Sequence, residues 1–300
     1  MAADDDARDC DVLILGASMA GIDVLYQLRR RLPGRALDVV VVDRQATHGY
    51  IPLVQERLCA RIDRAGSTLE TQRVVDADPR ARFVLGEVRS FDPARREVEL
   101  AGGQRLRGRF VVIALGSVVT PPAGLPGREH ALGYKFSAGF DGAAAALERA
   151  LTREGDAVPH FVVVGGGISG VELAGDLAHL GAARPSSWRA PRVTLVQSAA
   201  RLLPALTPRA GRLAARFLGR QGVELRLGTR VVELREHELV LRTRQSTSAS
   251  GGPYREGDGD GQVTLACDGV FWAGGVRPAP ALARLNLPTT EDGWLRVGPT

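Results

Sequence analysis

The sequence predicts an α/β protein with two Rossmann-like dinucleotide-binding domains, and a repeated pattern is the main reason. A run of aliphatic residues, a glycine-rich turn and a helical pattern follow one another over residues 12–28, and the same order returns over residues 161–177. A second aliphatic strand comes next each time, as a parallel β-α-β unit requires. A chain of 300 residues is long enough for two domains with separate cores.

Composition and charge limit the function. The net charge is +5, but the arginines are scattered without interleaved aromatic residues, so nucleic-acid binding is not expected. No apolar stretch reaches the roughly 18 residues of a membrane-spanning helix, and the acidic N-terminus does not resemble a signal peptide. Cys10, Cys59 and Cys267 are far apart in the sequence. This spacing favours reduced thiols over a disulfide, a redox-active dithiol or a metal site.

The first half of the chain alternates strand and helix. Val12–Leu15 is predicted to be a buried strand that ends at Gly16, and the next helix is expected to stop near Arg31, because Pro33-Gly34 follows. Leu37–Val42 is predicted as the second parallel strand. Further β segments are predicted at 83–91, 97–100 and 105–115, and a short helix at 54–62.

The second half repeats this plan, which indicates an internal duplication. The predicted elements are a helix at 143–151, a strand at 161–164, a helix at 168–180, a strand at 193–196, a helix at 208–220 and a strand at 223–227. The Ser-, Thr- and Gly-rich stretch 245–260 is predicted to be the tip of a hairpin. Gly269–Val276 is predicted as a strand that ends in glycines.

The first glycine turn reads G-x-S-x-x-G, with Ser18 between Gly16 and Gly21. Gly16 allows the sharp turn and Gly21 lets the helix pack on the strand, while Ser18 stands where a glycine usually lets the backbone approach a pyrophosphate. Asp43 ends the second strand, where a carboxylate accepts hydrogen bonds from ribose hydroxyls. The alternative is a structural turn with a surface aspartate, but the order of the elements favours dinucleotide binding.

The second glycine turn has the full G-x-G-x-x-G spacing at Gly165, Gly167 and Gly170. Its second strand ends at Gln197, a neutral amide that does not repel the 2′-phosphate of NADPH. Arg201 is close enough in sequence to pair with that phosphate. One hypothesis is therefore relaxed nucleotide choice or some preference for NADPH. The other is that Gln197 hydrogen-bonds the ribose of NADH and Arg201 is a solvated surface charge.

Glu172 is expected in the first turn of the helix that follows the second glycine motif. A carboxylate there stabilises a helix through its dipole, which is the structural interpretation. The functional interpretation places the carboxylate beside a bound nicotinamide. Residue patterns alone favour the structural one.

Four stretches resemble the FAD-dependent pyridine nucleotide oxidoreductases and, within that family, the type II NADH dehydrogenases, which are single-subunit NADH:quinone oxidoreductases. They are Gly16–Gly21 with Asp43-Arg44, His48–Leu53, Val163–Gly175 and Phe271–Pro278. The resemblance implies FAD at the first glycine turn and NADH or NADPH at the second. The second stretch lies where disulfide reductases place their redox cysteines, and it contains none.

The resemblance also implies roles for single residues. Asp43 would hold the adenosine ribose of FAD and Val88 would contact the adenine. Ala114 and Gly116 would line the FAD site. Glu172 would face the flavin–nicotinamide junction, which moves its interpretation toward catalysis. The expected cofactor-binding residues are Gly16, Ser18, Gly21, Asp43, Arg44, Val88, Ala114, Gly116, Gly165, Gly167, Ile168, Gly170, Gln197, Arg201, Gly274 and Gly275.

Three domain segments are expected: an FAD-binding domain over residues 1–122, an NAD(P)H-binding domain inserted in it over 123–275, and the start of the return to the FAD domain over 276–300. Members of the family continue past the position of Thr300 into a G-D motif and a C-terminal region for dimer contact, quinone access and membrane attachment. The chain is therefore expected to be a truncated sequence or a natural fragment.

The sequence thus predicts an FAD-dependent NAD(P)H dehydrogenase that passes hydride to flavin and then electrons to a quinone-like acceptor. Glu172 is the expected catalytic side chain, and no metal is expected. The expected location is the cytoplasm or the cytoplasmic face of the membrane, with membrane contact only through the missing C-terminal region and a homodimer as one expected assembly. Two alternatives stay open: a soluble, ferredoxin-reductase-like enzyme with a protein acceptor, and a truncated, non-catalytic nucleotide-binding or redox-sensing protein.

Overall fold

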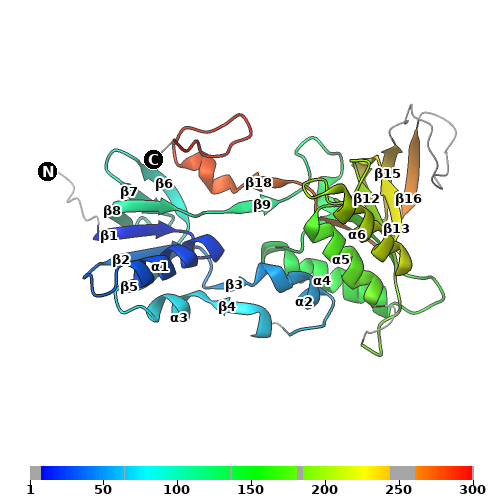
Figure 1. Cartoon of the computed structure of the whole chain (residues 1–300), viewed down its shortest axis with the longest axis horizontal. Helices are drawn as coiled ribbons and strands as arrows, with labels where there is room; N and C mark the ends of the chain where they lie inside the picture. The colour runs from blue at the N-terminus through cyan, green and yellow to red at the C-terminus, as the bar shows by residue number, and fades with distance from the viewer. Residues whose placement is uncertain (1–7, 64, 136, 181–184, 244–260, 299–300) are drawn as a thin grey trace. The chain divides into compact units, whose positions relative to one another are not determined.

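A computed structural model of the chain describes residues 8–63, 65–135, 137–180, 185–243 and 261–298 (Figure 1). The chain forms two compact units. Unit 1 comprises Met1–Tyr50, Thr68–Val118 and Val276–Thr300, and unit 2 comprises Ile51–Ser67 and Val119–Gly275. The predicted boundaries assign all of residues 1–122 to the first domain, whereas the structure groups Ile51–Ser67 with unit 2, because a short helix in this segment packs on the helices of that unit.

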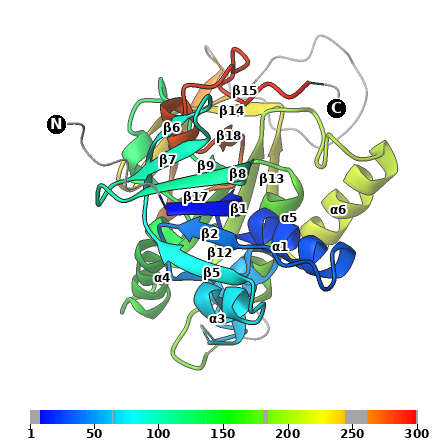
Figure 2. The same ribbon diagram turned by 90° about the vertical axis from the view of Figure 1, so that its left-hand side faces the viewer.

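The centre of unit 1 is a six-stranded sheet with the order β5-β2-β1-β8-β7-β6. Strands β1 (Arg8–Leu15), β2 (Val39–Asp43), β5 (Ala81–Leu85) and β8 (Arg105–Ile113) are parallel. Strands β7 (Glu97–Leu100) and β6 (Val88–Asp92) continue from β8 as an antiparallel meander. Figure 2 shows the parallel strands in this order, from β8 to β5.

Two ribbons connect unit 1 to the rest of the chain. Strands β3 (Thr47–Gly49) and β4 (Thr68–Glu70) pair with each other, and so do β9 (Ser117–Val119) and β18 (Val276–Pro278). The chain leaves for unit 2 twice, and each time it leaves and returns through one of these ribbons. Unit 1 also contains α1 (Met19–Arg31), α3 (Thr71–Asp76) and the 3₁₀ helix η4 (Pro280–Arg284).

Unit 2 has a five-stranded parallel sheet with the order β10-β17-β11-β12-β13 and a three-stranded antiparallel sheet with the order β14-β15-β16. The strands are β10 (Ala131–Leu132), β17 (Gly269–Trp272), β11 (His160–Val164), β12 (Arg192–Gln197), β13 (Glu224–Leu227), β14 (Thr229–Leu234), β15 (Glu238–Thr243) and β16 (Gln262–Ala266). The helices are α2 (Val54–Leu58), α4 (Ser137–Thr152), α5 (Ile168–His179) and α6 (Pro208–Arg220), with 3₁₀ turns η1 (Ile51–Leu53), η2 (Ala65–Ser67) and η3 (Arg128–His130).

Several elements differ in extent from the prediction. The β segment predicted at 83–91 is divided at Gly86, whose amide donates to the carbonyl of Asp43 at 2.8 Å and ends the pairing of β5 with β2. Helix α2 stops at Leu58 instead of residue 62, because Ala60 takes a left-handed backbone with φ of 55°. Helix α4 begins at Ser137, before the predicted start at residue 143. The hairpin tip predicted at 245–260 lies outside the described residues.

The core of each unit follows the alternation of its central strands. Leu13 and Leu15 on β1 pack in one cluster, whereas Val12 and Ile14 pack in another, on the opposite face of the sheet. Strand β11 of unit 2 divides its residues between two clusters in the same way. Both sheets are therefore buried on two faces, which explains their continuous aliphatic runs.

The two parallel sheets have the same connectivity, which agrees with the predicted duplication. β1 lies between β2 and β8, and β11 lies between β12 and β17. The Gly16 amide donates to the carbonyl of Val42 at 2.8 Å, and the Gly165 amide donates to that of Val196 at 2.8 Å. Each glycine turn thus begins at the same register position of its own sheet.

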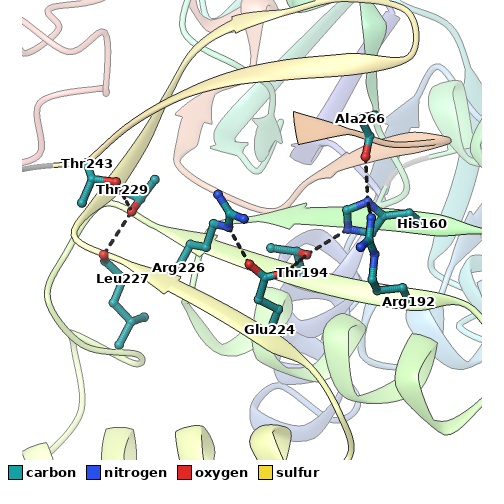
Figure 3. A network of polar contacts seen from close by, with 9 residues as sticks. All are labelled: His160, Arg192, Thr194, Glu224, Arg226, Leu227, Thr229, Thr243 and Ala266. Carbon is teal, nitrogen blue, oxygen red and sulfur yellow. Dashed lines mark hydrogen bonds and ion pairs between the residues drawn. The ribbon is translucent and has the colours of Figure 1, made fainter. Parts of the chain in front are cut away.

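A buried polar network joins the strands of unit 2 around His160 (Figure 3). Its Nδ1 lies 2.7 Å from the carbonyl oxygen of Ala266. Its Nε2 lies 2.9 Å from the hydroxyl of Thr194, and the guanidinium of Arg192 lies 2.9 Å from Nδ1. Burial, together with the charge of Arg192, lowers the pKa of His160, although Ala266, Glu224 and Asp268 act against this.

This lowered pKa predicts a pH dependence of stability. A histidine that resists protonation in the folded state contributes stability above the ordinary pKa of about 6.5, and that contribution is lost as the pH falls through this value toward the folded pKa. The Tm of the protein should therefore be lower at pH 5.5 than at pH 7.5, two values that lie about one unit on either side of that pKa. The difference in Tm between the two pH values should be smaller in His160→Gln. Equal decreases in Tm in the wild type and in His160→Gln, measured by thermal unfolding, would contradict the role of His160 in this pH dependence.

Candidate functional site

The first glycine turn joins β1 to α1 without room for side chains. Gly16 has a left-handed φ of 104°, and a Cβ there would lie 2.3 Å from the carbonyl oxygen of Ala114. A Cβ on Gly21 would lie 1.7 Å from the carbonyl oxygen of Gly16. The N-terminus of α1 therefore packs directly on the end of β1, where helix amides gather at the carboxyl edge of the parallel sheet.

Asp43 closes this turn from the end of β2. The amide of Ala17 donates to Asp43 Oδ2 at 2.7 Å, and the amide of Gln45 donates to Oδ1 at 2.9 Å. His48 Nε2 lies 3.1 Å from Oδ2. Burial acts to raise the pKa of Asp43, but hydrogen bonds from His48 and Ala17 outweigh it and hold the pKa below its ordinary value. Asp43 is therefore a carboxylate at neutral pH, fixed beside the turn.

The other predicted residues of unit 1 lie at the same sheet edge or in the core. Ser18 is the N-cap residue of α1 and makes no side-chain cap hydrogen bond. Arg44 is exposed just beyond Asp43. The side chain of Val88 is only 4% exposed and packs in the core of unit 1. Ala114 donates its amide to the carbonyl of Leu15 at 2.7 Å.

The second glycine turn repeats the first at the junction of β11 and α5. Gly165 has a left-handed φ of 114°, and a Cβ there would lie 2.7 Å from the Cα of Gly274. A Cβ on Gly170 would lie 1.8 Å from the carbonyl oxygen of Gly165. Close packing between backbones thus requires Gly165 and Gly170 in the folded protein itself.

Gly167 is a different case. It is the N-cap residue of α5, with φ of −75° and ψ of −177°, a conformation that any residue adopts. A Cβ on Gly167 would meet no atom within 4 Å. Packing within the protein does not require a glycine here. A side chain at this position would instead fill the space in front of the α5 N-terminus, and Ser18 occupies the equivalent position in unit 1.

Gln197 takes the place of Asp43 in the second turn. The amide of Gly166 donates to Gln197 Oε1 at 2.9 Å, as the amide of Ala17 does to Asp43. Gln197 is 8% exposed. The two turns are therefore closed by the same interaction, once with a charged acceptor and once with a neutral one.

Arg201 is engaged within the protein. Its guanidinium donates to the carbonyl oxygens of Leu203 at 3.1 Å, Leu206 at 3.0 Å and Pro204 at 2.7 Å. Neither hypothesis from the sequence described this state, because carbonyl acceptors in a loop leave no pattern in side chains. These hydrogen bonds use three of the five N–H donors of the guanidinium.

The remaining predicted residues of unit 2 lie around the same turn. Ile168, the first residue of α5, is 57% exposed. Gly274 lies against Gly165, and Gly275 has a left-handed φ of 70°. Gly116 of unit 1, with φ of 74°, is the counterpart of Gly275.

Glu172 begins the second turn of α5, not the first turn as predicted, because α5 begins at Ile168. Its Oε2 accepts a hydrogen bond of 3.2 Å from Nε2 of Gln55 on α2. Burial and the charge of Asp176 raise the pKa of Glu172, while Lys135 acts in the opposite direction. Burial lowers the pKa of Lys135, against the attraction of Glu172. This acid is therefore easier to protonate near neutral pH than a free glutamate.

The partners of Glu172 were not predicted from the sequence. Asp176 lies one helical turn further along α5 and forms an ion pair of 2.5 Å with Arg61. Its spacing of four residues from Glu172 predicts that the two carboxylates are neighbours on one face of the helix. Gln55 is 117 residues away from Glu172 in the sequence, and no local pattern predicts that contact. Lys135 was visible only as the single lysine of the chain.

The described cysteines, Cys10, Cys59 and Cys267, are free and buried. Burial raises the pKa of the Cys59 thiol, with Asp176 adding to the effect. Within the described ranges no group of His, Cys, Asp and Glu side chains has the arrangement of a metal site. Nor does any described helix combine the length and the apolar character needed to cross a membrane.

Comparison with known proteins finds a family that matches almost the whole chain. The family described as "Pyridine nucleotide-disulphide oxidoreductase" matches residues 10–299. The type II NADH:quinone oxidoreductase NdhA of Mycobacterium tuberculosis is 26% identical over 295 residues, covering 90% of this chain and 57% of its own length. Dihydrolipoyl dehydrogenase 3 of Pseudomonas aeruginosa is 30% identical over 238 residues, covering 68% of this chain and 46% of its own.

Solved structures share the fold at lower identity. NDH2 from Plasmodium falciparum in complex with NADH superposes with a TM-score of 0.76 at 14% identity, covering 94% of this chain and 58% of that one. Putidaredoxin reductase in its complex with putidaredoxin superposes with a TM-score of 0.71 at 21% identity, covering 94% and 62%. The chain thus spans little more than half the length of these proteins.

The contrast between Gly167 and Gly170 predicts different effects on stability. Gly170→Ala forces a Cβ onto a backbone oxygen 1.8 Å away, and should cost about 3 kcal/mol of unfolding free energy. Gly167→Ala meets no atom and should cost at most about 1 kcal/mol, from the poorer N-cap. Denaturant unfolding of the two variants beside the wild type measures both values. A Gly167→Ala variant as unstable as Gly170→Ala would contradict this distinction.

Proposed function

The chain belongs to the pyridine nucleotide-disulphide oxidoreductase family, and we propose that it is the nucleotide-binding part of an FAD-dependent NAD(P)H dehydrogenase with a quinone as electron acceptor. The observation that carries this proposal is the duplicated glycine turn, with one cradle in each unit. A single cradle binds one dinucleotide. Two cradles of the same register in one chain fit a flavin dinucleotide and a pyridine dinucleotide.

Unit 1 is the proposed FAD site. Gly16 and Gly21 bring the N-terminus of α1 close to the strand end, so that its free amides are available to a pyrophosphate. Asp43 is held as a carboxylate at the adjacent strand end, which is the group that binds ribose hydroxyls. Arg44, Ser18, Ala114, Gly116 and the backbone of Val88 are the proposed further contacts.

Unit 2 is the proposed NAD(P)H site, with Gly165, Gly167 and Gly170 as its cradle. The open space in front of Gly167 supports this assignment, since packing within the protein does not explain the glycine. Gln197 adds no negative charge beside the ribose, so we propose that both NADH and NADPH bind. Arg201 is not part of this proposal, because its guanidinium is bound to three carbonyls.

Bound FAD would accept hydride from NAD(P)H and release the electrons to the acceptor, so the chemistry belongs to the cofactors. The protein's part is to bind and orient them and to manage protons. Glu172 is the proposed proton-handling side chain. Burial raises its pKa above that of a free glutamate, which brings it closer to the pH at which proton transfer is efficient, and Gln55 fixes its position.

The choice of acceptor rests on relatives. The Mycobacterium tuberculosis relative is named as a NADH:quinone oxidoreductase, which supports a quinone, while the fold of a putidaredoxin reductase keeps a protein acceptor as the second candidate. Disulfide reduction is disfavoured, because the three described cysteines are buried and unpaired. A non-catalytic nucleotide sensor is the third candidate. We propose a location in the cytoplasm or at the cytoplasmic face of the membrane, and a homodimer as the assembly.

Spectroscopy of the flavin tests the function. The purified chain, supplied with FAD, should show the absorption bands of bound oxidised flavin, and anaerobic NADH or NADPH should bleach them. Kinetics with both nucleotides should give kcat/KM values within about tenfold of each other, because Gln197 at the second strand end is neutral and disfavours neither nucleotide by charge. A ubiquinone analogue should then restore the bands faster than a ferredoxin. Failure to take up FAD overturns the enzyme assignment, and uptake without bleaching favours the sensor.

Replacement of Glu172 tests the proton-handling role. Glu172→Gln should lower turnover with quinone by about tenfold or more and should leave the Kd for NADH within about threefold of the wild type. The rate of the wild type should fall as the pH rises through the raised pKa of Glu172, and the variant should lack this limb. Glu148→Gln, an exposed glutamate on α4, is the matched control. Unchanged turnover in Glu172→Gln would contradict the role.

A further inference from the structure

Trp272 has no assigned part in the function proposed above. It is the last residue of β17 and is paired with Val164, the last residue of β11. Trp272 is only 9% exposed, yet its indole does more than fill the core. Nε1 donates a hydrogen bond of 2.7 Å to the carbonyl oxygen of Gly274. The side chain thus reaches past one residue to hold the backbone of the turn that follows its own strand.

This hydrogen bond sets the plane of the peptide between Gly274 and Gly275. No cis peptide occurs in the described chain, and in a trans peptide the carbonyl and the N–H point in opposite directions. With the carbonyl oxygen held by the indole, the N–H of Gly275 faces away from Trp272. The left-handed φ of Gly275, 70°, fits this orientation, and a Cβ there would meet no atom within 4 Å.

The same peptide lies against the second glycine turn. The Ala273 amide donates to the carbonyl of Val164 at 2.8 Å, and a Cβ on Gly165 would lie 2.7 Å from both Cα and N of Gly274. The residue whose carbonyl the indole holds is therefore the residue that packs against the start of the second glycine turn.

Unit 1 holds the equivalent turn in another way. Ile113 pairs with Leu15 and is the counterpart of Trp272, and an aliphatic side chain donates no hydrogen bond. The carbonyl of Gly116 instead accepts from the amide of Ala279 at 3.2 Å. Each turn thus has a carbonyl held by a hydrogen bond, at Gly116 from a backbone amide and at Gly274, one position earlier in the turn, from a side chain.

We infer that Trp272 is a positioning residue of the NAD(P)H site, which fixes the 274–275 peptide against Gly165 and presents the Gly275 amide at the sheet edge where the nucleotide binds. This inference rests on the proposed function of unit 2. It concerns binding and not the hydride step, because the contact that carries it is between the indole and the backbone of the turn.

Trp272→Phe tests this inference, because it keeps an aromatic ring and removes the donor, while the accompanying loss of ring volume is matched by the control below. The Kd for NADH, measured by calorimetric titration of the full chain, should rise about threefold to tenfold. FAD uptake should not change, and kcat at saturating NADH should stay within about twofold of the wild type. Trp188→Phe is the matched control, since Trp188 is equally buried, at 9% exposure, in a different hydrophobic cluster of unit 2. Its Kd should equal that of the wild type.

Gly275→Ala is the second variant and does not disturb the core. A methyl group there has open space but strains the left-handed backbone, so the peptide should shift and the Kd for NADH should again rise. Equal Kd values in the wild type, Trp272→Phe and Gly275→Ala would overturn the inference and leave the proposed function intact. A rise in Trp188→Phe as large as in Trp272→Phe would also overturn it. Absence of NADH binding in the wild type would overturn the proposed function, and the inference with it.

Discussion

The contact of backbone on backbone at the two glycine turns is the constraint on which the rest of the structure depends. At Gly21 and Gly170 even one added carbon would overlap a carbonyl oxygen of the turn. The helix therefore approaches the strand end as closely as the backbone allows. This approach places unpaired helix amides at the carboxyl edge of each sheet, and it fixes where every other proposed contact must lie.

The strand-end side chain adds electrostatics to this geometry. Asp43 and Gln197 close equivalent turns by accepting from equivalent amides. The carboxylate attracts the amide more strongly, because a hydrogen bond to a charged acceptor is stronger than one to a neutral acceptor. The first turn is thus closed by a hydrogen bond and carries a negative charge, whereas the second is closed by a hydrogen bond without a charge. The two halves of a duplicated fold thus differ in charge at this strand end while the turn keeps the same hydrogen bond.

The sequence predicted the fold from patterns that are local in the chain. The strands and helices next to the glycine turns lie where the aliphatic runs and the 3.6-residue periodicity place them, and α6 has its predicted bounds of residues 208–220. Predictions were weaker where distant contacts decide. Helix α2 ends early at a left-handed Ala60, and residues 51–67 join unit 2 through packing that no local pattern encodes. The hydrogen bonds of Arg201 were not anticipated for the same reason, since its acceptors are backbone carbonyls. Gln55, the partner of Glu172, lies too far away in the sequence to be anticipated.

The passage of the chain through its two ribbons has a consequence for biosynthesis. Unit 1 needs residues on both sides of unit 2, because β18 and η4 follow Gly275. During translation the last strand of unit 1 emerges only after all of unit 2 has left the ribosome. Unit 2, in turn, takes α2 from the earlier excursion, so a polypeptide started at residue 119 would lack Val54, Leu58 and Cys59 from its interior. Neither half can be excised as one continuous piece with its interior complete, and the two must mature together.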